Sequence, residues 1–141
     1  MKVLCTINNI FEIGDSVTLD RIKKYIHLSD GQLDLKENLE YCVYGIVFRD
    51  NAPWYYLCLD EDDECPSPYP AELFKVTDGR LSSYWRLSTE VITDGVITSL
   101  VFDEWASDYS FYERLIDDDA SALEVFKNYQ CLMDKEKLME S

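Results

Sequence analysis

The sequence predicts an α+β fold, an antiparallel β-sheet meander of about six strands with C-terminal helices packed on it. Two observations indicate this class. Between residues 40 and 105, short segments rich in aromatic and β-branched residues alternate with turn signals. From residue 108 onward, apolar residues instead recur every three or four positions, as on an amphipathic helix. Both an open meander and a half-open barrel fit this pattern.

The first third of the chain is expected to hold one strand and one short helix. Residues 2–8 read as a strand because every second residue is apolar. Residues 18–26 fit a helix with Thr18 as its N-cap, and a strand is the alternative there. Turn chemistry at residues 14–15 and 29–31 separates this element from its neighbours.

The middle of the chain predicts three β-hairpins. Residues 40–49 and 54–59 flank a loop with turn chemistry. Two further turns carry Asp-Gly, at residues 78–79 and 94–95, a strong signal for a two-residue hairpin turn. The flanking strands would be residues 73–77 and 80–87 for the first of these, and 90–93 and 96–105 for the second.

The segment from Asp60 to Pro70 is expected to be an exposed loop. It contains five consecutive acidic residues followed by three prolines. Like charges repel each other, and proline has no backbone donor for a sheet ladder. Both effects disfavour a strand here.

Residues 108–138 predict the helical C-terminal part of a single domain spanning residues 1–141. The apolar spacing is interrupted at residues 117–119, so two helices are expected, with residues 119–121 capping the second. The apolar side chains of this part are too many to leave in water. Burying each large one contributes about 1.5–3 kcal/mol. We therefore expect the helices to pack on the sheet.

The net charge of −15 is the most informative number in the composition. Residues 1–50 carry eight acidic and six basic side chains, so −13 of the −15 lies beyond residue 50. A nucleic-acid-binding function is disfavoured, because phosphate contacts need clustered lysine and arginine. A membrane span needs about 18 consecutive apolar residues, and the longest mostly apolar run, Tyr41–Phe48, has eight.

Signatures of enzyme chemistry are missing from the sequence. The single histidine, His27, has no neighbouring nucleophile or carboxylate in a catalytic pattern. Five scattered cysteines without a C-x-x-C pair do not suggest a zinc site. They suggest a reducing cytoplasm, and no secretory signal is evident. The sequence thus predicts a non-enzymatic protein without metal or cofactor.

Charge and size favour a small cytoplasmic inhibitor of a basic protein, such as an immunity protein that neutralises a nuclease-type toxin. The alternatives are a nucleic-acid-mimicking phage or plasmid inhibitor of a host defence enzyme, and a small enzyme of unknown chemistry. Aromatic side chains such as Tyr55 would anchor the partner. The residues expected to form the protein-binding surface are Asp60, Glu61, Asp62, Asp63, Glu64, Trp85, Asp103, Glu104, Asp108, Tyr109, Asp117, Asp118 and Asp119.

Overall fold

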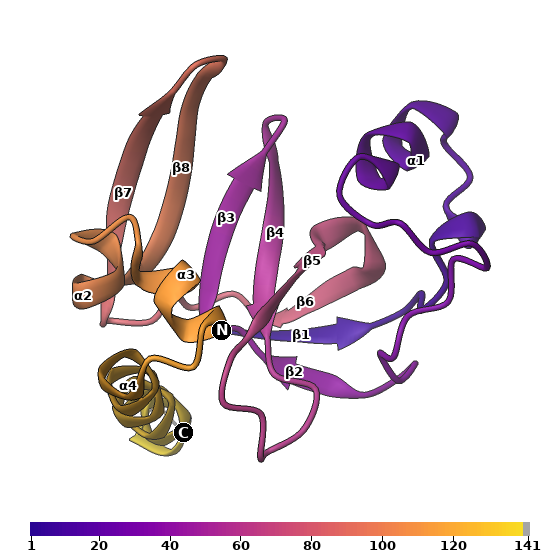
Figure 1. Ribbon diagram of the computed structural model, residues 1–141. Helices are drawn as coiled ribbons and strands as arrows, with labels where there is room; N and C mark the ends of the chain where they lie inside the picture. Colours follow the sequence, from indigo (N-terminus) through magenta and orange to yellow (C-terminus); the bar gives the residue numbers. More distant parts are fainter. Residues whose placement is uncertain (140–141) are drawn as a thin grey trace.

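The computed structural model of the chain describes residues 1–139, with side chains through Glu136 (Figure 1). It confirms the α+β class with antiparallel sheets and C-terminal helices, but the strands form two sheets, neither of which closes into a barrel. The strands are β1 (Lys2–Cys5), β2 (Glu40–Cys42), β3 (Gly45–Arg49), β4 (Ala52–Leu57), β5 (Ser67–Pro70), β6 (Phe74–Asp78), β7 (Trp85–Ile92) and β8 (Gly95–Phe102). The helices are η1 (Ile10–Glu12), α1 (Ser16–Lys23), η2 (Ala71–Leu73), α2 (Asp103–Ala106), α3 (Phe111–Ile116) and α4 (Ala120–Met139).

The smaller sheet has the order β2-β1-β6, with β1 in its centre. Val3 lies opposite Tyr41 on one side and Val76 on the other, and its side chain is fully buried. The strand expected over residues 2–8 ends at Cys5. Beyond that point the backbone N–H groups of Thr6 and Ile7 donate to the carbonyl of Leu73, outside the ladder.

The larger sheet has the order β5-β4-β3-β8-β7. Its β3–β4 hairpin confirms the first predicted hairpin, with Asp50 and Asn51 as a two-residue turn in which both residues have positive φ. The strand expected over residues 40–49 is split, because Val43 and Tyr44 carry the chain from one sheet to the other. Its first three residues form β2 and pair with β1.

Of the two Asp-Gly turns, one is a hairpin and one is not. The β7–β8 hairpin turns at Thr93 and Asp94, one residue earlier than predicted, because Ile92 pairs with Gly95. The hairpin predicted at residues 78–79 is wrong, since β6 pairs with β1 and β7 pairs with β8. The strand predicted over residues 96–105 also ends early, at the start of α2.

The segment from residue 60 to residue 70 is only partly a loop. Residues 60–64 form it, and four of these five are exposed. Residues 67–70 instead form β5, in which Pro68 and Pro70 lie opposite Tyr56 and Trp54 of β4. An edge strand tolerates proline because its outer side needs no hydrogen bond. The expectation of an exposed loop therefore fails for this half.

Helix α1 begins before the position that the sequence indicates. Asp15, not Thr18, is the N-cap, and its carboxylate accepts hydrogen bonds from the Thr18 amide at 3.2 Å and hydroxyl at 2.6 Å. The helix then ends at Lys23.

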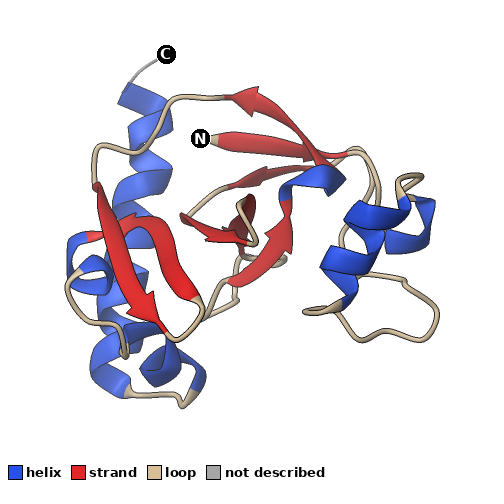
Figure 2. Cartoon of the chain, turned by 90° about the horizontal axis from the view of Figure 1, so that it is seen from above, coloured by secondary structure: helices blue, strands red, loops and turns tan. Residues whose placement is uncertain are grey.

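The C-terminal helices pack against the larger sheet, on the opposite side of the molecule from α1 (Figure 2). Phe102, at the end of β8, is fully buried against aromatic rings from α2, α3 and α4, and the Tyr129 ring stacks on it at 4.1 Å. Asp119 caps α4 by accepting a hydrogen bond from the Ala122 amide at 3.0 Å. The predicted packing and the break between α3 and α4 are thus confirmed, although Ile116 and Leu132 remain exposed.

Candidate protein-binding surface

The acidic loop of residues 60–64 lies beside the first half of α4. Loop residues 61–64 form one wall of a groove of about 580 Å³, and Leu123, Glu124, Phe126, Lys127 and Gln130 of α4 form the other. The loop is held by Asp63, whose carboxylate accepts hydrogen bonds from the backbone amides of Leu59 and Asp60. Its acidic neighbours are left to face solvent. An open groove with one carboxylate-rich wall suits a cationic side chain.

The second acidic run, residues 117–119, lies at the junction of α3 and α4 near this loop. Burial raises the pKa of the Cys65 thiol, and the negative charges of Asp118 and Asp63 raise it further. One carboxylate from each run therefore acts on the same thiol. The Tyr112 hydroxyl of α3 also donates to the carbonyl of Pro66 at 2.6 Å, so α3 contacts the segment that follows the acidic loop.

Two of the expected carboxylates share one cationic partner within the chain. The Arg114 guanidinium lies 2.8 Å from Asp108 and 3.6 Å from Asp119. Hydrogen bonds from Ser110 and the Arg114 charge hold the pKa of Asp108 below its ordinary value. Asp108 and Asp119 therefore contribute less to the electrostatic attraction of a basic partner than the exposed residues 60–62 do.

Asp103 and Glu104 lie in the first turn of α2, where a negative charge is favourable. The Glu104 carboxylate, followed by burial, raises the pKa of the Tyr129 hydroxyl to about 12. These two acids are thus close to α4 through Tyr129, which is not one of the groove residues.

The aromatic residues expected to anchor a partner are mostly inside the protein. Trp85 is 7% exposed and its indole N–H donates to the Tyr44 carbonyl at 3.2 Å, so its placement on the binding surface is wrong. Tyr55 is equally buried. Only Tyr109 is exposed, and its hydroxyl donates to the Thr89 carbonyl at 2.7 Å. Strand alternation alone could not reveal that Trp85 and Tyr55 are both covered by other parts of the chain.

Exposed apolar side chains that the sequence did not single out lie near the acids. Ile116 is 58% exposed directly before the 117–119 run. Three further residues on the β7–β8 hairpin, Leu87, Val91 and Val96, are more than half exposed. Helical spacing places Ile116 with the core residues, and only the packing of α3 shows that it points outward.

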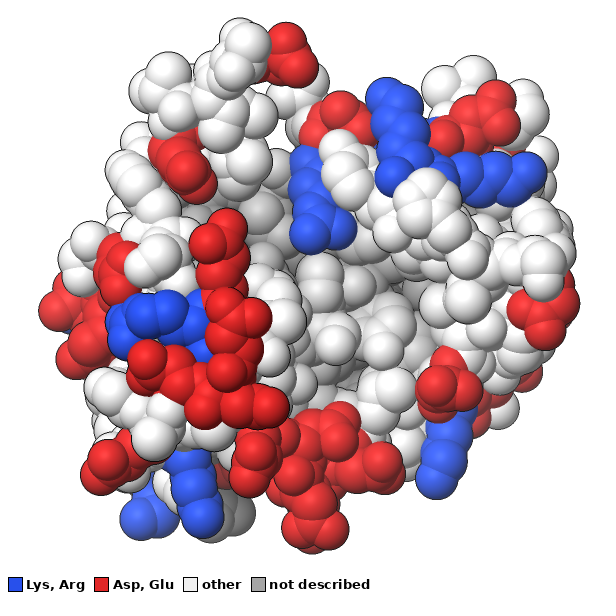
Figure 3. All heavy atoms as spheres, in the orientation of Figure 1, with Lys and Arg blue, Asp and Glu red and all other residues white. Residues whose placement is uncertain are grey.

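The charges are unevenly spread over the face shown in Figure 3. Acidic side chains gather over α2, α3 and the acidic loop. Several lysine and arginine side chains lie around α1, with acidic side chains among them. The surface is hollowed between these two regions. A partner approaching the helical side meets mainly carboxylates.

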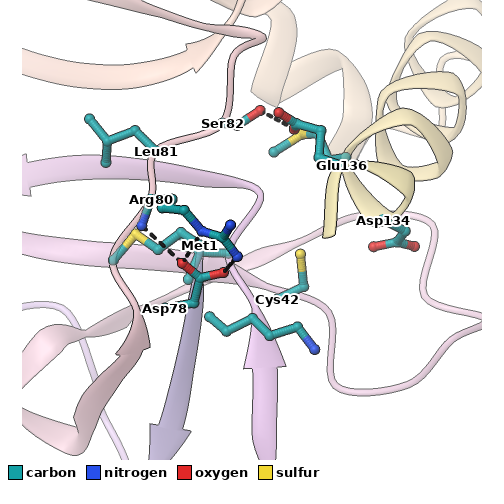
Figure 4. Close-up of a pocket in the computed structure, with 11 residues that line it drawn as sticks. Met1, Cys42, Asp78, Arg80, Leu81, Ser82, Asp134 and Glu136 are labelled. Atoms are coloured by element: carbon teal, nitrogen blue, oxygen red, sulfur yellow. Dashed lines mark hydrogen bonds and ion pairs between the residues drawn. The ribbon is translucent and has the colours of Figure 1, made fainter. Parts of the chain in front are cut away.

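A separate pocket of about 260 Å³ lies between the smaller sheet and the end of α4 (Figure 4). Its charged side chains bond to the chain itself. Asp78 accepts three hydrogen bonds from Arg80, and Glu136 accepts others from Ser82 and Ser83. Burial raises the pKa of the Cys42 thiol in this pocket to about 11, so it is protonated and poorly nucleophilic at neutral pH.

Within the described residues, no group of three or more His, Cys, Asp and Glu side chains is placed to hold a metal ion. No helix among residues 1–139 has the length and apolar character needed to cross a membrane. Comparison with protein-family models, curated proteins and solved structures finds no match to this chain.

Proposed function

We propose that this chain is an acidic binding protein that inhibits a basic protein partner. The observation that carries the proposal is the groove between the acidic loop and α4, with the second acidic run close by. Carboxylates on one side of a molecule accelerate encounter with a positively charged surface and fix its orientation. The exposed Ile116 and Tyr109 supply apolar area beside the charges, as an interface core requires.

Among basic partners, a nuclease-type toxin fits best, and the chain would then act as an immunity protein in the cytoplasm. A nuclease needs a basic cleft to hold its anionic substrate, and a carboxylate-rich surface competes for that cleft. Occupation of the cleft would inhibit the nuclease without any chemistry by this chain.

The proposal is tested with two variants that change net charge equally. The loop variant Glu61→Gln, Asp62→Asn, Glu64→Gln removes three exposed carboxylates from the groove and leaves Asp63 in place. The control variant Glu12→Gln, Asp20→Asn, Glu37→Gln removes three exposed carboxylates from the first third of the chain. Each immobilised protein is exposed to a lysate of the source cells, and retained proteins are identified by mass spectrometry.

We expect the wild type and the control variant to retain a basic protein that the loop variant retains weakly. The nuclease activity of that protein should fall as wild-type chain is added to a 1:1 ratio. Its association rate should fall steeply with salt, because exposed charges are screened beyond about 8 Å at physiological ionic strength. Equal retention by both variants would contradict the role of the groove. Retention of a host defence enzyme that acts on nucleic acid would favour mimicry of nucleic acid instead.

A further inference from the structure

Arg49 differs from the other four arginines in having no hydrogen-bond acceptor within the described part of the chain. Its Cζ atom lies 4.8 Å from the ring centroid of Tyr25 and 4.9 Å from that of Trp54. The other guanidinium groups all donate to oxygen, namely Arg21 to Glu72, Arg80 to Asp78, Arg86 to the carbonyls of Ser83 and Trp85, and Arg114 to Asp108. In a chain with 28 acidic residues, such an arginine is unexpected.

The position of Arg49 is fixed by its surroundings. It is the last residue of β3, it is half-buried, and two aromatic rings that meet edge to face hold its side chain. The neighbouring carboxylate, Asp50, accepts a hydrogen bond from the Tyr25 hydroxyl at 3.0 Å and forms an ion pair with Lys24 at 3.6 Å. A guanidinium stacked on aromatic rings keeps its N–H groups free to bind an acceptor and loses little entropy on doing so.

Two more donors without acceptors lie around the same tyrosine. The Trp54 side chain is 1% exposed, and its indole N–H has no acceptor. The buried Nη1 of Arg21 also has none, although its Nη2 pairs with Glu72, whose buried Oε1 likewise has no donor. Arg21 acts electrostatically on the Tyr25 hydroxyl together with Arg49. Buried donors that lack acceptors are rare in folded proteins and call for an explanation. Here the two buried donors, from Trp54 and Arg21, accompany the half-buried Arg49 near one tyrosine that is itself 40% exposed.

We propose that the surface around Arg49, beside Tyr25 and the β3–β4 turn, binds a small oxyanion, a carboxylate or a phosphate group, through the Arg49 guanidinium. The guanidinium presents two parallel N–H groups, the geometry that both kinds of oxyanion accept. Tyr25 and Trp54 position it.

The test is a titration of the full chain with inorganic phosphate and, separately, with acetate. Sodium chloride keeps the ionic strength constant. Proton–nitrogen NMR spectra follow the Trp54 indole and the Arg49 Nε–H signals. The variants are Arg49→Gln, Arg49→Lys and, as the control, Arg86→Gln, which removes an arginine that donates only to backbone carbonyls.

We expect saturable shifts of both signals with at least one anion, and the anion that saturates identifies the class. Affinity should fall about tenfold or more in Arg49→Gln and also in Arg49→Lys, which keeps the charge but loses the paired donors. Arg86→Gln should bind within about twofold of wild type. Shifts that never saturate with either anion, or equal affinity in Arg49→Gln and Arg86→Gln, would overturn the proposal. If Arg49→Gln does not fold, the affinity of Arg49→Lys is compared with that of Arg86→Gln in its place.

Discussion

Gly45 lies where β3 is flanked by β4 and β8, and the sheet leaves no room for a side chain there. A Cβ atom at this position would lie 3.0 Å from Cγ1 of Val101 and 3.3 Å from Cδ2 of Tyr56, both in buried residues. We expect Gly45→Ala to lower the free energy of unfolding by about 1–3 kcal/mol through overpacking. Urea denaturation measures this change.

Gly14 provides the matched control, because a Cβ atom there would meet nothing within 4 Å. Gly14→Ala should change the free energy of unfolding by no more than about 0.5 kcal/mol. A similar loss in both variants would show that the crowding around Gly45 is not the cause.

Asp108 should make stability depend on pH in the acidic range. Hydrogen bonds from Ser110 and Arg114 lower its pKa in the folded protein relative to the unfolded chain. Such a group stabilises the fold above its ordinary pKa, about 3.9. That stabilisation is lost as pH falls through the lowered value.

We therefore expect Asp108→Asn to be less stable than wild type at pH 7, with a difference that shrinks as pH falls below about 4. Urea denaturation of both proteins between pH 7 and pH 3 gives this difference directly. A difference that is constant over the whole range would mean that the charge of Asp108 plays no part.

Among the elements, the acidic loop should be the most accessible to proteolysis. It is exposed, it connects β4 to the edge strand β5, and within residues 60–64 the side chain of Asp63 alone accepts backbone hydrogen bonds. A protease that cleaves after acidic residues should cut there first. Mass spectrometry of early fragments locates the cut.

The variant Glu61→Gln, Asp62→Asn, Glu64→Gln should be cut there more slowly, since three recognition residues are gone. A first cut within the β3–β4 hairpin would contradict this expectation for the loop.

The two Asp-Gly pairs show which part of this fold a sequence can predict. Both have the same local chemistry, but only the pair at residues 94–95 belongs to a hairpin. At residues 78–79 the preceding strand pairs with β1, more than 70 residues earlier, and the Asp78 carboxylate binds Arg80. Turn chemistry predicts that a chain changes direction. It does not predict which strand is next to it.

The candidate site also has one part that the sequence predicts and another that depends on the folded structure. The exposed acids could be named from the sequence, because runs of like charge are stable only in water. The burial of Trp85 could not, since its indole N–H binds the carbonyl of Tyr44, 41 residues earlier in the chain. The stacking of Arg49 on two aromatic rings could not be predicted from the sequence either, because Tyr25 and Trp54 come from separate segments.

For the whole molecule, a net charge of −15 on 141 residues implies repulsion within the fold. Salt screens this repulsion, with a screening length of about 10 Å at 0.1 M. We expect the melting temperature to rise as sodium chloride increases from about 20 to about 500 mM, because repulsion among 28 acids outweighs the few ion pairs.

Differential scanning calorimetry at constant pH measures this rise, and potassium chloride should give the same result. A melting temperature that falls with either salt would show that the ion pairs of the chain stabilise it more than its excess charge destabilises it.

The central place of β1 in the smaller sheet affects how the protein forms on the ribosome. Val3 pairs with both Tyr41 of β2 and Val76 of β6. One edge of β1 therefore stays unpaired until β6 has been synthesised. At about 5–20 residues per second, the delay is on the order of 4–15 s. An unpaired strand can join another nascent chain during that time. The four-residue length of β1 and the charge of Lys2 at its start limit that danger during synthesis.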